Sequence, residues 1–107
     1  MALTRDFKAT VMARVESDPE FARALLDEAV TLFLSGESET AKLILRDLVN
    51  ATLGFEELAA AVDKPSKSVH RMLSPSGNPT MTNLAAIFAA LKRTLKVEIQ
   101  AHAVSIT

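Results

Sequence analysis

The feature that most constrains the fold is a break between two short helical patterns in the middle of the chain. Residues 55–62 and residues 66–73 both space their apolar side chains as one face of a helix does. These positions are Leu58, Ala59 and Val62 in the first stretch and Val69, Met72 and Leu73 in the second. Between them, Pro65 has no amide donor and disfavours a helical backbone at Lys64. The sequence therefore predicts a helix-turn-helix over residues 55–74.

The second of these helices is predicted to carry a polar face. Ser66, Lys67, His70 and Arg71 fall together opposite the apolar positions, with Ser68 beside them. Hydrogen-bond donors and positive charge on a short helix suit phosphates and the acceptor edges of bases in a major groove. Other interpretations stay open at this point: an ion pair at the surface for Arg71, a helix cap for Ser66, and a phosphate rather than a base for Lys67.

The charge of the chain is divided between its halves. Residues 1–63 contain six Lys and Arg against twelve Asp and Glu, a balance of −6, whereas residues 64–107 contain six against one, a balance of +5. The sum of the two is the net charge of −1. Such an asymmetry indicates two surfaces with different partners, and the basic half contains the polar helix face. The alternative is a dipolar surface without a partner.

Start and stop signals predict further helices on both sides of the motif. Thr4 can cap a first helix, Asp18-Pro19 restarts the chain, Ser38 can cap a third helix, and Gly54 suits a left-handed backbone. The expected helices cover residues 5–17, 19–35, 38–53 and 80–94. In the helix over residues 38–53, we expect Lys42, Arg46 and Asp47 to face outward.

The last thirteen residues show the period of a strand. Val97, Ile99, Ala101 and Ala103 alternate with polar side chains, and the phase changes at Val104. We therefore expect an all-α protein, a five-to-six-helix bundle over residues 1–94 with a C-terminal β-strand over residues 95–107. A lone strand needs a partner for its backbone groups, which favours a homodimer built on this segment. An extension of the last helix or a frayed end is the alternative.

Composition excludes several classes of site. The chain has no cysteine and only two histidines, so we expect neither a metal nor a cofactor. Ser68 and His70 lie two apart on a helix and point in different directions, and no phosphate loop or nucleophile elbow is present, so we do not expect an enzyme. There is no apolar leader and no membrane-length apolar run, so the expected location is the cytoplasm.

Several sequence stretches resemble one family. They are Leu3-Thr4-Arg5-Asp6-Phe7, Asn50-Ala51-Thr52, Gly54-Phe55-Glu56-Glu57-Leu58-Ala59, Lys64-Pro65-Ser66-Lys67-Ser68-Val69, Arg71-Met72-Leu73-Ser74-Pro75 and Gly77-Asn78-Pro79-Thr80. Together they make residues 3–93 similar to the HigA-type addiction-module antidote proteins, which are antitoxins with a phage-repressor-like helix-turn-helix. The chain differs from the usual pattern at Phe55, where a polar residue such as Gln is common, and at Asp63, where Gly is common.

The resemblance implies a function and a set of contacts. It implies a sequence-specific DNA-binding transcriptional regulator that represses its own operon, with double-stranded operator DNA, a small ribonuclease toxin and a second copy of the chain as partners. The positions that resemble the family's base-reading ones are Ser66, Lys67 and Arg71, flanked by Ser68 and His70. Those that resemble its phosphate contacts are Asn78, Thr80 and Thr82. An orphan regulator without a toxin and an interaction module that does not bind DNA are the alternatives.

Overall fold

Six α-helices make up the body of the protein in the part of the chain that the structure describes. The computed structural model describes residues 5–107, the first four of them by their backbone only. The helices are α1 (Arg5–Ser17), α2 (Pro19–Leu34), α3 (Ser38–Ala51), α4 (Gly54–Val62), α5 (Ser66–Met72) and α6 (Met81–Leu95). The all-α expectation is confirmed, and the predicted helices are present with bounds that differ by at most two residues. The expected cap at Thr4 lies outside the described residues. No helix in the described part of the chain is long and apolar enough to cross a membrane.

Side chains cap two of the helix starts. Asp18 begins α2 by accepting hydrogen bonds from the amides of Glu20 (3.1 Å) and Phe21 (3.4 Å). A hydrogen bond from Arg14, followed by those two amides, lowers the pKa of the Asp18 carboxyl. Thr80 begins α6 in the same way, by accepting from the amide of Asn83 at 3.1 Å. Ser38 was expected to cap α3, but it is the first helical residue; Glu37 precedes it and makes no side-chain cap.

The turn before α5 depends on a left-handed residue. Asp63 ends α4 with φ 56° and ψ 49°, and the amide of Lys64 bonds the carbonyl of Ala59 at 3.0 Å. This is the pattern with which helices commonly end, usually at glycine, because a Cβ makes the conformation costly. Gly54 also has a positive φ, 79°, but it opens α4 rather than following α3.

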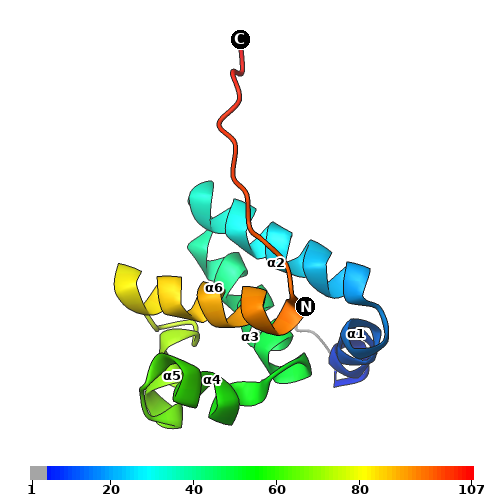
Figure 1. Cartoon of the computed structure of the whole chain (residues 1–107), viewed down its shortest axis with the longest axis vertical. Helices are drawn as coiled ribbons and strands as arrows, with labels where there is room; N and C mark the ends of the chain where they lie inside the picture. Colours follow the sequence, from blue (N-terminus) through cyan, green and yellow to red (C-terminus); the bar gives the residue numbers. More distant parts are fainter. Residues whose placement is uncertain (1–4) are drawn as a thin grey trace.

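The core gathers around α3, which packs against α1, α2 and α4 (Figure 1). The side chains with no exposed surface include Leu45 and Leu48 of α3, Leu58 of α4, Val69 of α5 and Ile87 and Leu91 of α6. Burial on this scale supplies the main driving force for folding. Because Val69 belongs to this core, the short helix α5 is fixed relative to the body.

The expected C-terminal β-strand is wrong. Residues 5–107 contain no strand: α6 ends at Leu95, Lys96 takes a left-handed backbone (φ 58°), and an extended tail follows. The side chains of Val97 and Ile99 pack on the core, and residues 101–107 are exposed. No backbone–backbone hydrogen bond holds residues 98–107 within the described chain. These two apolar side chains of the alternating pattern anchor the start of the tail. The helical body offers no sheet edge with which the tail could pair as a strand.

We expect Asp63→Gly to stabilise the protein by up to about 1 kcal/mol. Glycine adopts the left-handed backbone without the steric cost that Asp63 bears, although it also gains freedom in the unfolded chain. Urea denaturation followed by circular dichroism would measure the change. Lys64→Gly is the matched control, because the backbone there is not left-handed, and it should lower stability. A loss of stability in Asp63→Gly would contradict this account.

Candidate nucleic-acid interface

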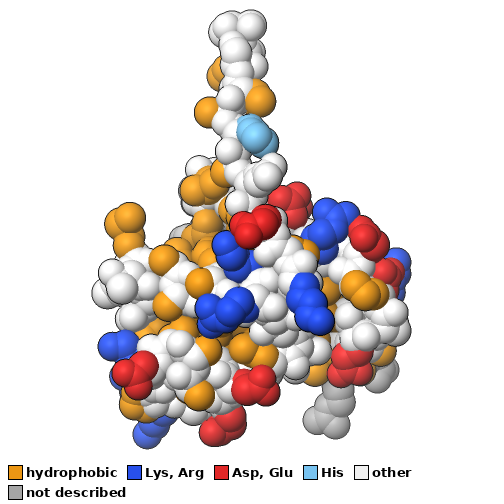
Figure 2. All heavy atoms as spheres, viewed as in Figure 1, with side chains coloured by type: hydrophobic (Ala, Val, Ile, Leu, Met, Phe, Trp, Pro, Cys, Tyr) orange, Lys and Arg blue, Asp and Glu red, His pale blue; other side chains and the backbone are white. Residues whose placement is uncertain are grey.

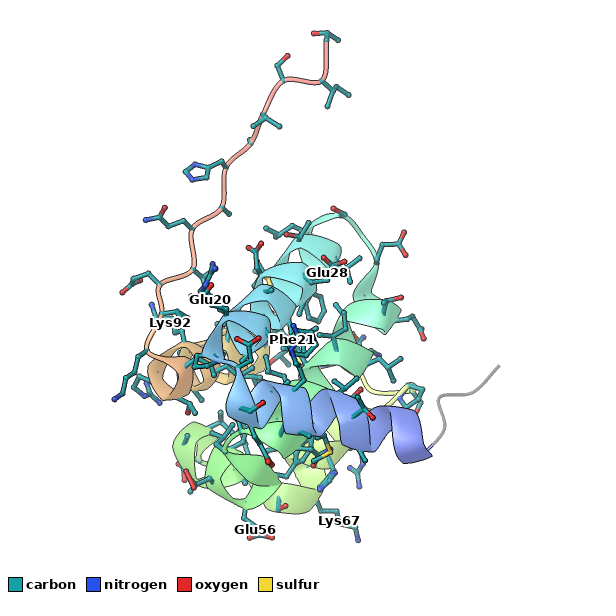
Figure 3. All side chains as sticks on the ribbon, turned by 90° about the vertical axis from the view of Figure 1, so that its right-hand side faces the viewer. Glu20, Phe21, Glu28, Glu56, Lys67 and Lys92 are labelled. Atoms are coloured by element: carbon teal, nitrogen blue, oxygen red, sulfur yellow. The ribbon has the colours of Figure 1, made fainter. Side chains whose placement is uncertain are left out.

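The structure presents the predicted polar face of α5 to solvent. Val69 and Leu73 are buried, with 0% and 1% of their surfaces exposed, and they turn the opposite side of the helix outward. On that side Lys67, His70 and Arg71 are exposed, while Ser66 and Ser68 are half-buried. Figure 3 shows Lys67 pointing away from the body at the end of the molecule opposite the tail. The helix thus offers two cations from adjacent turns to a ligand.

Ser66 does not cap α5. Pro65, with φ −62° and ψ 145°, occupies the cap position, and no side chain bonds the free amides of the first turn. Ser66 is instead the first helical residue. Its hydroxyl therefore makes no capping hydrogen bond to the first turn of α5. The observed geometry excludes the alternative role of Ser66 as a helix cap.

His70 has a packing contact that the sequence did not reveal. Its ring stacks on the ring of Phe55, with centroids 3.9 Å apart and planes 18° from parallel. Phe55 is only 6% exposed and stands at the start of α4. The pair joins the two helices of the motif. An aromatic residue at position 55 thus supports α5 by packing.

The loop between α5 and α6 folds back onto the end of α5. The hydroxyl of Ser74 donates to the carbonyl of Arg71 at 2.7 Å, and the amide of Gly77 donates to the carbonyl of Ser74 at 2.9 Å. Gly77 approaches so closely that any Cβ would overlap the carbonyl oxygens of Arg71 and Met72. Only glycine fits this approach without a shift of the backbone.

This approach brings predicted contacts from two elements together. Ser68 and Arg71 of α5 and Asn78 of the loop line one open cavity of about 310 Å³, together with Met72, Ser76 and Gly77. Asn78, Thr80 and Thr82 are all exposed. The hydroxyl oxygen of Thr80 accepts the cap bond from Asn83, so its proton is still available for donation.

A buried lysine holds this loop in place. Lys42 of α3 was expected to face outward, but it is 94% buried, with an exposed fraction of 6%. Its Nζ donates to the carbonyl of Gly77 at 2.6 Å and to that of Pro75 at 3.3 Å. The aliphatic stem lies in the apolar interior while the amine reaches loop carbonyls that would otherwise lack a donor. The signal that could have revealed it is spacing, since Lys42 precedes the buried Leu45 and Val49 by three and seven residues.

Acidic side chains also lie at this end of the molecule. Glu56 and Glu57 belong to the first turn of α4, and both are exposed. Figure 3 shows Glu56 and Lys67 projecting from the same end. Phosphates would be repelled by Glu56 and attracted by Lys67, so a polyanion can approach favourably in few orientations. Mixed charge of this kind favours selective over indiscriminate binding.

We expect Lys42→Met to lower the free energy of unfolding by about 1–3 kcal/mol. Methionine keeps an unbranched stem but cannot donate, which leaves the carbonyls of Pro75 and Gly77 without their buried donor. Thermal or urea denaturation measures the loss, and hydrogen exchange should locate it in residues 74–79. Lys64→Met is the control, because Lys64 is exposed. Equal stability of the Lys42 and Lys64 variants would show that the two hydrogen bonds contribute nothing.

Comparison with known proteins identified no relative of this chain. No family model, no curated protein and no solved structure matches the chain. Among the described residues, no group of His, Cys, Asp or Glu side chains is placed to hold a metal ion. The chemistry of the site is that of α5, the loop that follows it and the lysine that holds this loop in place.

Proposed function

We propose that the protein is a sequence-specific DNA-binding transcriptional regulator that reads a major groove with α5. The observation that carries the proposal is the exposed face of α5 together with the loop anchored beside it. A helix supported by a buried core and a second helix is the arrangement with which helix-turn-helix proteins enter the groove. The cavity shared by Arg71 and Asn78 supports contact with a backbone and a base edge from one place.

Each exposed residue of α5 then has a role that its chemistry suits. Arg71 presents a planar fork of donors, which matches the two acceptors of guanine. Lys67 lies one turn earlier and points away from the body in Figure 3, as a phosphate contact requires. Ser66 and Ser68 supply short hydroxyl donors near the start of the helix. His70 has one ring face against Phe55, so only its edge and other face are available.

The loop and the start of α6 supply the proposed contacts to the DNA backbone. Asn78, Thr80 and Thr82 are neutral donors, which position a protein on phosphates without adding to the charge. Their value depends on rigidity, because a donor that must first be ordered loses binding free energy. The two hydrogen bonds from Lys42 supply that rigidity.

We propose further that the protein is the antitoxin of a toxin–antitoxin pair and represses its own operon. The resemblance to HigA-type antidote proteins supports this role, as does the acidic first half of the chain. Glu20, Asp27 and Glu28 are exposed on α2. Figure 3 shows Glu20 and Glu28 far from Lys67, toward the end that carries the tail. A basic ribonuclease could bind there by charge complementarity while α5 remains free for DNA.

The DNA proposal predicts different effects for two neighbouring cations. Arg71→Ala should cost about 1–3 kcal/mol of binding free energy and relax the preference at one base pair. Lys67→Ala should weaken all sequences alike and reduce the salt slope of the affinity by about one unit. Titrations of operator variants at several salt concentrations measure both effects.

The matched control for these variants is Arg23→Ala. Arg23 is an exposed arginine of α2 that pairs with Glu20, and Figure 3 shows Glu20 far from Lys67 of α5. Its loss should leave DNA affinity unchanged. The proposal fails if the wild-type protein protects no sequence in its own upstream region at low salt.

The antitoxin proposal predicts a stable complex with the product of the adjacent gene. Co-expression followed by purification through a tag on one partner should recover both proteins. Glu20→Gln with Glu28→Gln should weaken the complex, because two attractive charges are removed. An adjacent product that neither binds nor inhibits growth when expressed alone would count against the role.

A further inference from the structure

The start of the C-terminal tail and α2 together enclose a small cavity. In Figure 1 the tail leaves the end of α6 and crosses α2. The cavity has a volume of about 140 Å³ and is lined by Arg23, Leu26 and Asp27 of α2 and by residues 97–100 of the tail. This cavity, the tail-base pocket, borders the acidic face of α2 to which the toxin is proposed to bind.

The tail side of the pocket is held in place although it is not a strand. The left-handed backbone of Lys96 sets the direction in which the chain leaves α6. The amide of Val97 donates to the carbonyl of Lys92 at 3.0 Å, and the side chains of Val97 and Ile99 pack on the core. The Nζ of Lys92 lies 3.2 Å from a carboxylate oxygen of Glu98. The pocket is therefore already formed in the free protein, so binding there does not require the start of the tail to be ordered first.

The lining combines an apolar floor with an acidic rim. Leu26 is only 2% exposed, and Val97 and Ile99 are half-buried. Asp27 and Glu98 are exposed at the edge. Figure 2 shows Asp and Glu side chains at the base of the tail. A ligand that fits this lining has an apolar stem and a positively charged end.

The charge balance also favours a cation. Arg23 of the rim is already paired with Glu20. Glu98 is paired with Lys92, through an ion pair that is largely exposed to solvent. Asp27 has no ion-pair partner among the described residues. Three carboxylates therefore stand against two cations at the pocket, and one negative charge is left for a ligand to neutralise.

We propose that the tail-base pocket receives a lysine or arginine side chain of the toxin. The aliphatic stem of this side chain covers the apolar floor, and its charged end reaches Asp27 and Glu98. The volume suits one side chain better than a free small molecule, because small-molecule pockets typically measure about 300–1,000 Å³. The inference rests on the proposed antitoxin role and extends it, since it makes residues 97–100 part of the toxin interface.

The kinetics of binding to the product of the adjacent gene distinguish a filled pocket from general attraction. Asp27→Asn removes a carboxylate of the lining with little change of shape. Glu28→Gln, the matched control, removes the same charge from the next residue of α2, which is exposed and lies outside the lining. A charge paired within an interface acts mainly on dissociation, whereas a charge at its edge acts mainly on association.

We therefore expect different effects from these two neighbouring changes. Asp27→Asn should speed dissociation of the complex about 10-fold. Glu28→Gln should slow association about two-fold, in a salt-dependent way, and leave dissociation unchanged. Surface plasmon resonance with the tagged partner on the chip measures both rate constants.

Lys92→Met tests whether Glu98 contacts the toxin or only positions the tail. Lys92 competes with the cation of the toxin for Glu98, while an exposed ion pair adds little to the stability of the fold. If Glu98 bonds the toxin, Lys92→Met should bind it about two- to five-fold more tightly. Weaker binding would mean that the ion pair serves to hold the tail, and it would contradict the proposed contact.

The outcomes separate this inference from the proposed function. If the wild-type protein does not bind the adjacent gene product, the antitoxin proposal fails and this inference fails with it. If the wild-type protein binds and Asp27→Asn dissociates no faster than Glu28→Gln, the antitoxin role stands and the pocket is not part of the interface. If Asp27→Asn changes the oligomeric state of the protein alone in light scattering, the pocket binds a second copy of the chain and the proposal is overturned.

Discussion

The proposed DNA-binding surface depends on a buried lysine that holds the loop after α5 from the inner side, opposite the side proposed to contact DNA. Lys42 belongs to α3, the helix around which the core is built, and its amine bonds two carbonyls of the loop that follows α5. A lysine in the interior is costly unless its charge has partners. Here the cost is offset by carbonyls that the helices cannot satisfy. The rigidity of the core thereby extends to Asn78, an exposed residue of that loop.

The motif itself is held by three contacts of different kinds. The left-handed backbone of Asp63 sets the direction in which the chain leaves α4. The stacked rings of Phe55 and His70 hold the two helices together. Gly77 seats the loop on the last carbonyls of α5. Since α5 has only seven residues, its own hydrogen bonds would not keep it helical in isolation. The helical conformation of α5 therefore depends on its packing against the rest of the protein.

The sequence was a good guide to the helices and to the breaks between them, and a poor one to the C-terminal tail. Proline, glycine and capping residues act locally, so the breaks at Asp18-Pro19 and Asp63-Lys64-Pro65 could be predicted. The tail could not, because alternation reports which side chains are half-buried and not whether a strand partner exists. Ser38 failed as a cap because the helix began one residue earlier than its side chain required.

The candidate site could also be predicted from the sequence only in part. The exposure of Lys67, His70 and Arg71 follows from helical periodicity, and the structure shows it. Spacing places Lys42 on the buried face of α3, but the loop carbonyls that its amine bonds lie 33 to 35 residues away in the chain, and no local pattern encodes that contact. The roles of these residues on DNA remain predictions, since neither the structure nor any relative tests them.

The corner between α1 and α2 has a consequence for how the chain assembles. Arg14 reaches Asp18 at 3.3 Å, and its guanidinium carbon lies 4.8 Å above the centre of the Phe21 ring. All three side chains lie within eight consecutive residues, so closing this corner costs little loop entropy. Contacts of such short range can form within the time that a helix needs to form. The corner is thus suited to be an early step of folding, one that joins the first two helices before any distant part of the chain has been gathered.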